Sequence, residues 1–239
     1  MSNKPVYKRI LLKLSGEALM GDGDFGIDPE VLQTVAKELA ELQQAGVQIG
    51  LVIGGGNIFR GAGLAQSGID RTRADQMGML ATVMNSLAMQ DAILKQGGEC
   101  QVLSALSLDQ ACEVHSANRA RNHLDKGRVV IMAAGSGNPY FTTDTAAGLR
   151  ALEIHADLLL KGTKVDGIYD SDPNKNPDAK RYDSIGYNEA ISKELGVMDL
   201  TALVLCRDNA MPMQVYNLFE AGKLSAIVHG ESAGTKVEV

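Results

Sequence analysis

The stretch Val52-Ile53-Gly54-Gly55-Gly56-Asn57-Ile58-Phe59-Arg60-Gly61 ends a short apolar run in three consecutive glycines. Because glycine has no Cβ, the backbone at such a run can pass close to a ligand and present successive N–H groups to it. A helix beginning at Asn57 would add free N–H groups and the positive end of its dipole, which favour phosphate. Arg60 would add donors suited to phosphate oxygens. A tight turn is the alternative, but one or two glycines would serve it, so the stretch predicts a phosphate-binding loop after a buried strand.

Apolar runs of strand length alternate with segments of helical periodicity along the chain. The expected strands are residues 10–12, 47–53, 100–103, 129–132 and 157–160, with closing strands at 215–216 and 226–228. Helices are expected from Pro29 to a stop at Gly46, and over 71–96, 108–124, 142–154, 188–195 and 200–207. This alternation predicts an α/β fold with a mainly parallel sheet. No linker or internal repeat interrupts it, so residues 1–239 are expected to form a single domain.

Composition limits the possible partners and compartment. The chain is 45% hydrophobic and carries a net charge of −6, so nucleic acid is not expected as a partner. No apolar stretch approaches the roughly 18 residues of a membrane span. Cys100, Cys112 and Cys206 are an odd, widely spaced set, unlike a disulfide framework. We therefore expect a cytoplasmic globular protein.

Loops that carry glycine or lysine follow several predicted strands, at residues 13–17, 54–61, 135–144 and 161–164. Ligands of parallel sheets bind outside the C-terminal ends of the strands, so these loops are expected to meet at one site. The ammonium groups of Lys13 and Lys161 would converge there on a transferred phosphate, because phosphoryl transfer depends on cations and backbone N–H groups. Asp144 could orient the two lysines, serve as a helix N-cap, or do both.

Other nucleotide and metal motifs fail on inspection. The G-x-G-x-x-G match at Gly21–Gly26 does not follow a strand, and its two aspartates would repel a pyrophosphate. The segment Asp170–Asn174 resembles the start of a calcium loop but lacks the glycine that such a loop needs next. Cys112, His115 and His123 lack a fourth metal ligand in sequence. We therefore expect no metal ion bound directly by the protein.

The helix expected over 71–96 is apolar on more than one face. Its apolar residues are Met77, Leu80, Met84 and Leu87, together with Met79 and Val83. A helix of this kind is buried on several sides, either within the fold or against another copy of the chain. We favour a subunit interface.

The chain resembles the amino acid kinase superfamily in residues 13–17, 54–61 and 137–144. The blocks Met77-Gly78-Met79-Leu80-Ala81-Thr82 and Lys164-Val165-Asp166-Gly167-Ile168-Tyr169 narrow the resemblance to members that phosphorylate UMP. The resemblance implies an αβα sandwich around a mainly parallel twisted sheet. It also implies transfer of the γ-phosphate of ATP to UMP, giving UDP and ADP, with Mg²⁺, in pyrimidine nucleotide biosynthesis. Members of the family are homohexamers built from dimers, inhibited by UTP and activated by GTP.

The resemblance also implies roles for individual residues. The residues that match the catalytic set are Lys13, Asp144, Lys161 and Arg60. Those that match ATP contacts are Lys13, Leu14, Ser15, Gly16, Gly56, Arg60, Thr163, Tyr169 and Asp172. Those that match UMP contacts are Gly55, Asp75, Ser136, Gly137, Asn138, Pro139, Tyr140, Phe141, Thr142 and Thr143, with Asp75 accepting from ribose hydroxyls. The allosteric segment is matched by Gly21, Asp22, Gly23, Asp24, Phe25 and Gly26.

The sequence departs from some relatives where GTP regulation is concerned. Gln90, Leu94 and Gln101 stand at positions where basic residues are expected in GTP-regulated members. Two alternatives to UMP phosphorylation stay open. One is a family member acting on a carboxylate or carbamate, and the other is a nucleotide-binding sensor or storage protein without turnover. The presence of Lys13, Asp144 and Lys161 favours a kinase over the latter.

Overall fold

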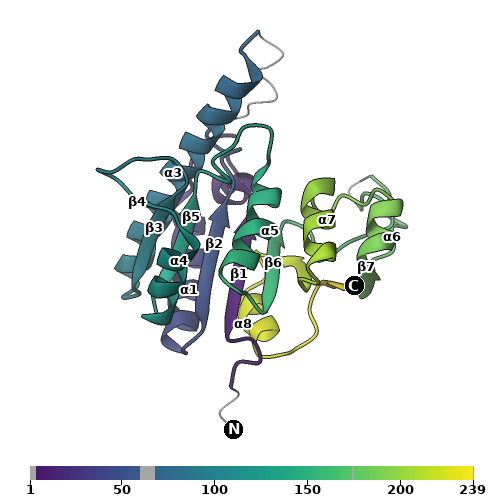
Figure 1. Ribbon diagram of the computed structural model, residues 1–239. Helices are drawn as coiled ribbons and strands as arrows, with labels where there is room; N and C mark the ends of the chain where they lie inside the picture. Colours follow the sequence, from purple (N-terminus) through teal and green to yellow (C-terminus); the bar gives the residue numbers. More distant parts are fainter. Residues whose placement is uncertain (1–3, 60–67, 174, 239) are drawn as a thin grey trace.

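A computed structural model describes residues 4–59, 68–173 and 175–238 (Figure 1). Within them, nine strands form one sheet in the order β4-β3-β5-β2-β1-β6-β8-β9-β7. The strands are β1 (Arg9–Leu14), β2 (Gln48–Ile53), β3 (Cys100–Ser104), β4 (Glu113–Val114), β5 (Val129–Ala133), β6 (Leu158–Thr163), β7 (Ser184–Gly186), β8 (Met213–Asn217) and β9 (Thr235–Glu238). All neighbouring strands in it are parallel except β8 and β9. The predicted α/β fold with a mainly parallel sheet is confirmed.

Helices cover both faces of this sheet. They are α1 (Pro29–Gln44), α3 (Arg71–Lys95), α4 (Ala117–Asp125), α5 (Thr143–Glu153), α6 (Tyr187–Ser192), α7 (Leu200–Asp208) and α8 (Lys223–Val228), with a 3₁₀ turn η1 (Gly16–Met20). Successive side chains of a strand point to opposite faces. Ile10 and Leu12 of β1 therefore pack in one apolar core with α1, α3 and α8, whereas Leu11 packs in the other with α4 to α7. The layers form the αβα sandwich that the resemblance implied (Figure 1).

The first β-loop-α-β unit has the expected local chemistry. Asp28 is the N-cap of α1 and accepts hydrogen bonds from the backbone N–H groups of Glu30 and Val31. Pro29 occupies the first helical position, where its missing N–H costs nothing. The helix ends at Gln44, and Gly46 follows in the left-handed region at φ 90°. β1 and β2 then pair in parallel, as predicted.

Two segments differ from their predicted structure. Residues 108–124 are not one helix, because Ser116 caps α4 through a 3.3 Å bond from Arg119 N and the residues before it include β4. Serine is favoured at such caps and disfavoured inside helices. Residues 226–228 are the end of α8 rather than a strand, and the closing strand β9 lies further along the chain.

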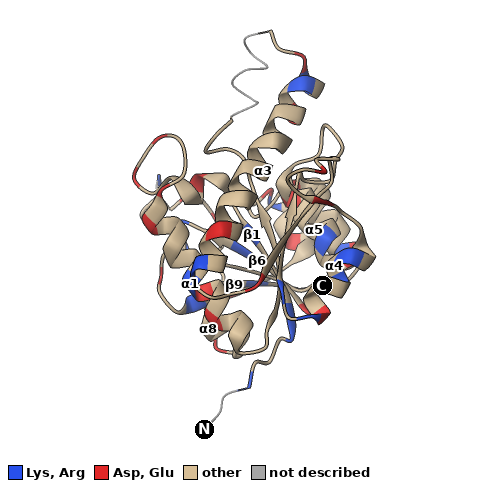
Figure 2. Cartoon of the chain, turned by 90° about the vertical axis from the view of Figure 1, so that its left-hand side faces the viewer, with Lys and Arg blue, Asp and Glu red and all other residues tan. Residues whose placement is uncertain are grey.

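The cysteines are unpaired, and the surface charges are of mixed sign. Cys100, Cys112 and Cys206 are all free and buried. Burial raises the pKa of Cys100 to about 12 and that of Cys206 to about 11. On the face turned to the viewer in Figure 2, Lys and Arg are interspersed with Asp and Glu rather than gathered in one patch. In the part of the chain that the structure describes, no helix combines the length and apolar character needed to cross a membrane.

Candidate active site

The centre of the site is a carboxylate held between two lysines. Lys13 of β1 and Lys161 of β6 lie in adjacent parallel strands, near the C-terminal ends of both. Asp144 lies in the first turn of α5, and its Oδ1 is 2.5 Å from Lys13 Nζ. Its Oδ2 is 3.1 Å from Lys161 Nζ. The N-cap of α5 is Thr142, so the alternative N-cap role of Asp144 is wrong.

Burial and the opposite charges within this cluster shift the pKa values of Asp144 and Lys161. Burial by itself would raise the pKa of Asp144, but the charges of Lys13 and Lys161 outweigh it and hold that pKa below 3.8. Burial lowers the pKa of Lys161 below 10.5, and the Asp144 carboxylate opposes this shift. The Lys161 ammonium also donates to the carbonyl of Val197. Two cations around one carboxylate suit a further anion such as phosphate.

The glycine run lies beside the first lysine loop. The N–H of Gly54 donates to Leu14 O at 2.8 Å, which continues the pairing of β1 and β2. A Cβ on Gly16 would lie 2.5 Å from Asn57 Oδ1 and 2.7 Å from Gly56 N, so only glycine permits this approach. Both predicted phosphate loops therefore meet at the carboxyl edge of the sheet.

The local conformation of the run differs from the prediction. Residues 56–58 form a turn in which the N–H groups of Ile58 and Phe59 donate to Gly55 O, at 3.0 and 2.9 Å. The helix start considered at Asn57 is not found there, since residues 56–58 are a turn and the buried Asn57 side chain bonds to Asn85. Arg60 and Gly61 lie outside the described residues.

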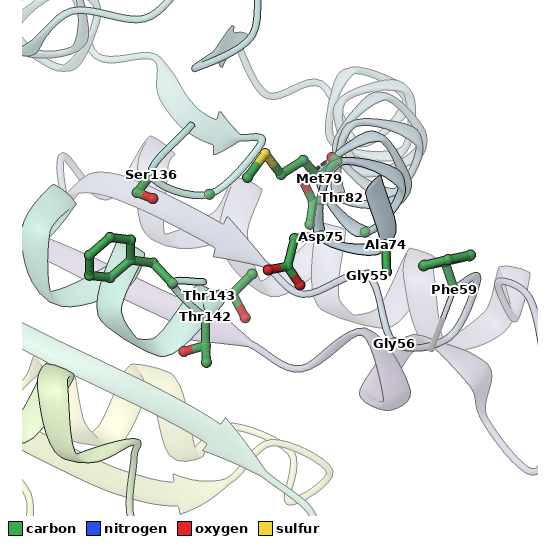
Figure 3. Close-up of a pocket in the computed structure, with 13 residues that line it drawn as sticks. Gly55, Gly56, Phe59, Ala74, Asp75, Met79, Thr82, Ser136, Thr142 and Thr143 are labelled. Carbon is green, nitrogen blue, oxygen red and sulfur yellow. Dashed lines mark hydrogen bonds between the residues drawn. The ribbon is translucent and has the colours of Figure 1, made fainter. Parts of the chain in front are cut away.

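A first cavity of about 290 Å³ opens between α3, the glycine run and the loop after β5 (Figure 3). Its lining includes six of the residues predicted for UMP: Gly55, Asp75, Ser136, Phe141, Thr142 and Thr143. Gly56, predicted for ATP, also lines it. Gly137, Asn138, Pro139 and Tyr140 belong to the same loop but do not line the cavity. Six residues that were not among the predicted substrate contacts complete the wall: Phe59, Ala74, Gly78, Met79, Thr82 and Gly135.

Asp75 points into this cavity from α3 (Figure 3). It accepts from Tyr140 N at 2.7 Å and from Arg71 Nε at 2.9 Å. The Arg71 guanidinium in turn lies 5.5 Å from the centre of the Tyr140 ring. The carboxylate thus ties the loop after β5 to the helix across the cavity from it.

A second cavity, of about 490 Å³, lies beside β6 and the segment that follows it. Thr163, Tyr169 and Asp172, the three residues predicted for the adenosine side, all line it. Lys13, Leu14, Ser15 and Gly16 do not line either cavity. The Leu14 side chain is fully buried in the core, so only its backbone could face a nucleotide.

The lysine cluster lies next to wall residues of both cavities. Val197, whose carbonyl accepts from Lys161, lines the second cavity. Thr143, the residue before Asp144, lines the first. The cluster therefore has an immediate neighbour in the wall of each cavity.

Several residues that brace the site were not predicted. Arg150 of α5 donates to Gly135 O at 2.9 Å, and Thr82 of α3 accepts from Ala134 N at 2.8 Å. Asp199, the N-cap of α7, accepts from the hydroxyls of Thr142 and Thr145. Asp199 carried a readable signal, since an aspartate before a helical segment predicts a cap. Thr82 belongs to the block Met77–Thr82 that narrowed the resemblance, whereas Arg150 had no signal, because a helical arginine usually indicates a surface residue.

Neither cavity is lined by Cys112, His115 or His123, considered as metal ligands, or by residues 21–26, considered for allosteric control. Over residues 4–59, 68–173 and 175–238, no group of three or more His, Cys, Asp or Glu side chains is placed to hold a metal ion. His115 bonds to Glu153, and His123 bonds to Glu113. The two histidines therefore do not form a common ligand set with Cys112. Residues 21–26 form a loop, and Gly26 N donates to Asn57 O at 2.8 Å.

The fold and site define the class of protein. The family model described as "Amino acid kinase family" matches residues 8–217 of this chain. The chain belongs to the amino acid kinase family and is a kinase.

Individual relatives narrow the likeness further. The chain is 60% identical over 232 residues to the uridylate kinase of Xanthomonas oryzae pv. oryzae, covering 97% of each. It shares 60% identity, with the same coverage, with the uridylate kinase of Methylococcus capsulatus. The UMP kinase structure from Bacillus anthracis matches with a TM-score of 0.94 at 38% identity, covering 97% of this chain and 96% of that one. The Ureaplasma parvum UMP kinase gives 0.91 at 36% identity, covering 97% and 99%. The resemblance read from the sequence is confirmed.

Proposed function

We propose that this kinase transfers the γ-phosphate of ATP to UMP, giving UDP and ADP, as a step of pyrimidine nucleotide biosynthesis. The observation that carries the proposal is the pair of cavities, each with a wall residue bonded to or adjacent to the Lys13–Asp144–Lys161 cluster. A phosphoryl donor and acceptor need separate sites that meet at a cationic centre. Relatives of 60% identity named uridylate kinase support UMP as the acceptor.

The two substrates are assigned by size and chemistry. The larger cavity, about 490 Å³, suits ATP, and the smaller one, about 290 Å³, suits UMP. Asp75 offers carboxylate oxygens for the ribose hydroxyls, and Ser136, Thr142 and Thr143 offer hydroxyls to the phosphate. Gly55 and Gly56 would present adjacent N–H groups between the acceptor and donor phosphates.

The reaction needs no protein nucleophile. The acceptor phosphate of UMP attacks the γ-phosphorus in line while the two lysines stabilise charge on the transferred group. Both oxygens of Asp144 already face lysines, so the residues fit a magnesium ion held by the nucleotide phosphates rather than by protein ligands. A magnesium ion held in that way would supply further positive charge to the transferred phosphate.

The remaining expectations also belong to this proposal. A homohexamer built from dimers is supported by an apolar stripe on α3, where Met77, Leu80 and Met84 are 42%, 46% and 55% exposed. UTP would inhibit by sharing the uridine contacts of UMP, and the loop 21–26 is the candidate segment for activation by GTP. The single-domain organisation is supported by the continuous sheet. The cytoplasmic location stays a prediction.

A steady-state assay tests the proposal. ATP and Mg²⁺ are supplied with UMP, CMP, dUMP, glutamate, aspartate or carbamate, each with and without GTP and UTP. We expect UDP formation with UMP to exceed every other product by orders of magnitude. Turnover of glutamate, aspartate or carbamate instead would assign the chain to another branch of the family. Binding of ATP and UMP by calorimetry without UDP would make it a nucleotide sensor.

A further inference from the structure

Two asparagine side chains form a buried pair beneath the glycine run. Asn57 is 1% exposed and Asn85, on α3, is fully buried. Asn57 Nδ2 donates to Asn85 Oδ1 at 2.9 Å, and Asn85 Nδ2 donates to Asn57 Oδ1 at 2.7 Å. Each amide therefore gives and receives one bond within the pair. A buried polar pair of this kind holds one geometry, because breaking either bond leaves a donor or acceptor without a partner.

The remaining donors of the pair reach the backbone of two loops. Asn85 Nδ2 also donates to Gly54 O at 2.7 Å, at the first glycine of the run. Asn57 Nδ2 donates to Gly26 O at 2.9 Å, and Gly26 N donates back to Asn57 O at 2.8 Å. The pair thus links α3, the glycine run and the loop 21–26.

The loop after β1 rests on the same pair. A Cβ on Gly16 would lie 2.5 Å from Asn57 Oδ1, 2.7 Å from Gly54 O and 2.7 Å from Gly56 N. The backbone of Gly16 is therefore packed directly against the amide and the run. A shift of Asn57 would move the surface on which the Lys13–Gly16 segment sits.

α3 also fixes the distance between itself and the glycine run. A Cβ on Gly55 would lie 2.8 Å from Gly78 O and 2.9 Å from the Ala81 Cβ, so the backbone of Gly55 touches the helix. Asn85 lies one helical turn beyond Ala81, and its amide fixes the run laterally through Gly54 O. The packing of Gly55 on α3 therefore fixes the distance between the run and the helix, and the Asn85 amide fixes the orientation of the run.

We propose that Asn85 is a positioning residue that acts through Asn57, and that this pair aims the N–H groups of Gly55 and Gly56 at the phosphates. The effect on turnover rests on the proposed function, whereas the effect on the backbone of the run does not. Neither asparagine lines the two cavities, so neither acts by touching substrate there. Loss of the pair lowers kcat, because misplacement by about 1 Å can cost about a hundredfold in rate.

The test uses Asn85→Ala with Ser86→Ala as its matched control. Ser86 is equally buried on α3, but its hydroxyl donates only to Thr82 O within the helix. We expect Asn85→Ala to lower kcat about 10- to 100-fold while the KM values for ATP and UMP change less than about threefold. Ser86→Ala should leave kcat within about twofold of the wild type. Equal effects of the two substitutions would overturn the proposal, as would a change confined to KM.

Two further measurements separate positioning from general loss of structure. Hydrogen exchange of Asn85→Ala should quicken at residues 21–26 and 54–59 and stay unchanged in β6 and α7. Uniform quickening would contradict the proposal. In a double-mutant cycle, Asn57→Ala and Asn85→Ala should cost no more together than the worse one alone, because they break one unit. Additive losses would show two independent residues. If the wild type forms no UDP, the proposed function fails, yet the exchange pattern still decides whether the pair fixes the run.

Discussion

Lys13 and Lys161 are register partners in neighbouring parallel strands, β1 and β6. Two buried like charges so close together would repel, and the structure resolves this by placing one carboxylate from α5 between them. The arrangement holds both ammonium groups on one carboxylate, at the carboxyl edge of the sheet.

Lys13→Ala should lower kcat by about 100- to 1,000-fold, the usual cost of removing one donor that stabilises transition-state charge. The Lys13 side chain is only 7% exposed, so the loss is not one of surface charge. UDP formation at saturating ATP and UMP measures it. Lys8→Ala, an exposed lysine just before β1, is the control and should keep full activity. Turnover of Lys13→Ala close to wild type would remove the residue from its role.

Asp144→Asn should both inactivate and destabilise the protein. It leaves two ammonium groups of low exposure without their counter-ion, and breaking such a pair costs about 3–5 kcal/mol. Because the folded-state pKa of Asp144 lies below 3.8, its stabilising contribution is present above that pH and is lost as pH falls further. Urea unfolding at neutral pH measures the loss. The gap between variant and wild type should narrow in acid, and a constant gap would argue against the ion pair.

Turnover should fall on the alkaline side at a pH below the ordinary lysine value of 10.5, because burial lowers the pKa of Lys161. The proton is lost as pH rises, and with it the charge that stabilises the transferred phosphate. In Asp144→Asn the carboxylate that opposes this shift is gone, so the pKa of Lys161 should fall further. Titration of the Lys161 side chain by ¹³C NMR follows both proteins. An unchanged or higher pKa in the variant would contradict the electrostatic account.

Adjacent glycines of the run should respond differently to alanine. A Cβ at Gly55 meets Gly78 O at 2.8 Å and Ala81 at 2.9 Å, so Gly55→Ala must displace the run from α3 and lower the melting temperature. At Gly56 the nearest atom is Glu17 Cγ at 3.7 Å, an ordinary contact. Gly56→Ala should therefore fold normally yet lose activity, because its methyl group lines the cavity where phosphate must approach. Thermal melts and kcat/KM distinguish the two, and full activity of Gly56→Ala would refute the close approach.

Asp75→Asn should raise the KM for UMP and leave the KM for ATP nearly unchanged. The amide can still accept one bond but offers the ribose hydroxyls no charge-assisted partner. It also weakens the tie to Tyr140 N, so the loop after β5 should become more exposed to protease. Arg71→Ala is the companion variant, since it breaks the ion pair and leaves the carboxylate in place. An Asp75→Asn enzyme with unchanged KM for UMP would count against the assignment.

The sequence was sufficient to predict the chemistry wherever residues sit at strand ends. Lys13 and Lys161 follow apolar runs, and parallel strands bring their carboxyl ends to one edge, so their convergence could be inferred. The meeting of Asp144 with them was one of two roles left open by its place at a helix start, and the resemblance favoured it. The two separate cavities needed the folded chain, since their walls come from segments far apart in the sequence, such as those of Gly55 and Phe141.

The failures have equally local causes. Ala226-Ile227-Val228 is a β-branched apolar run that reads as a strand, but it is the end of the short helix α8, where Ile227 and Val228 join the core shared with α1. Tertiary burial decided between the two structures. Asn57 and Asn85 are separated by 28 positions and have no sequence pattern that pairs them. Their partnership depends on how α3 crosses the sheet, which single-sequence periodicity does not encode.

The buried thiols make the protein a convenient host for chemical probes. All three native cysteines are free, covered and held in the protonated state by their raised pKa values. A maleimide dye reacts with thiolate, so it should pass over them in the folded protein. A single cysteine introduced at an exposed position such as Phe219 would then be labelled alone. Fluorescence from such a site could report substrate-driven motion without first removing any native cysteine.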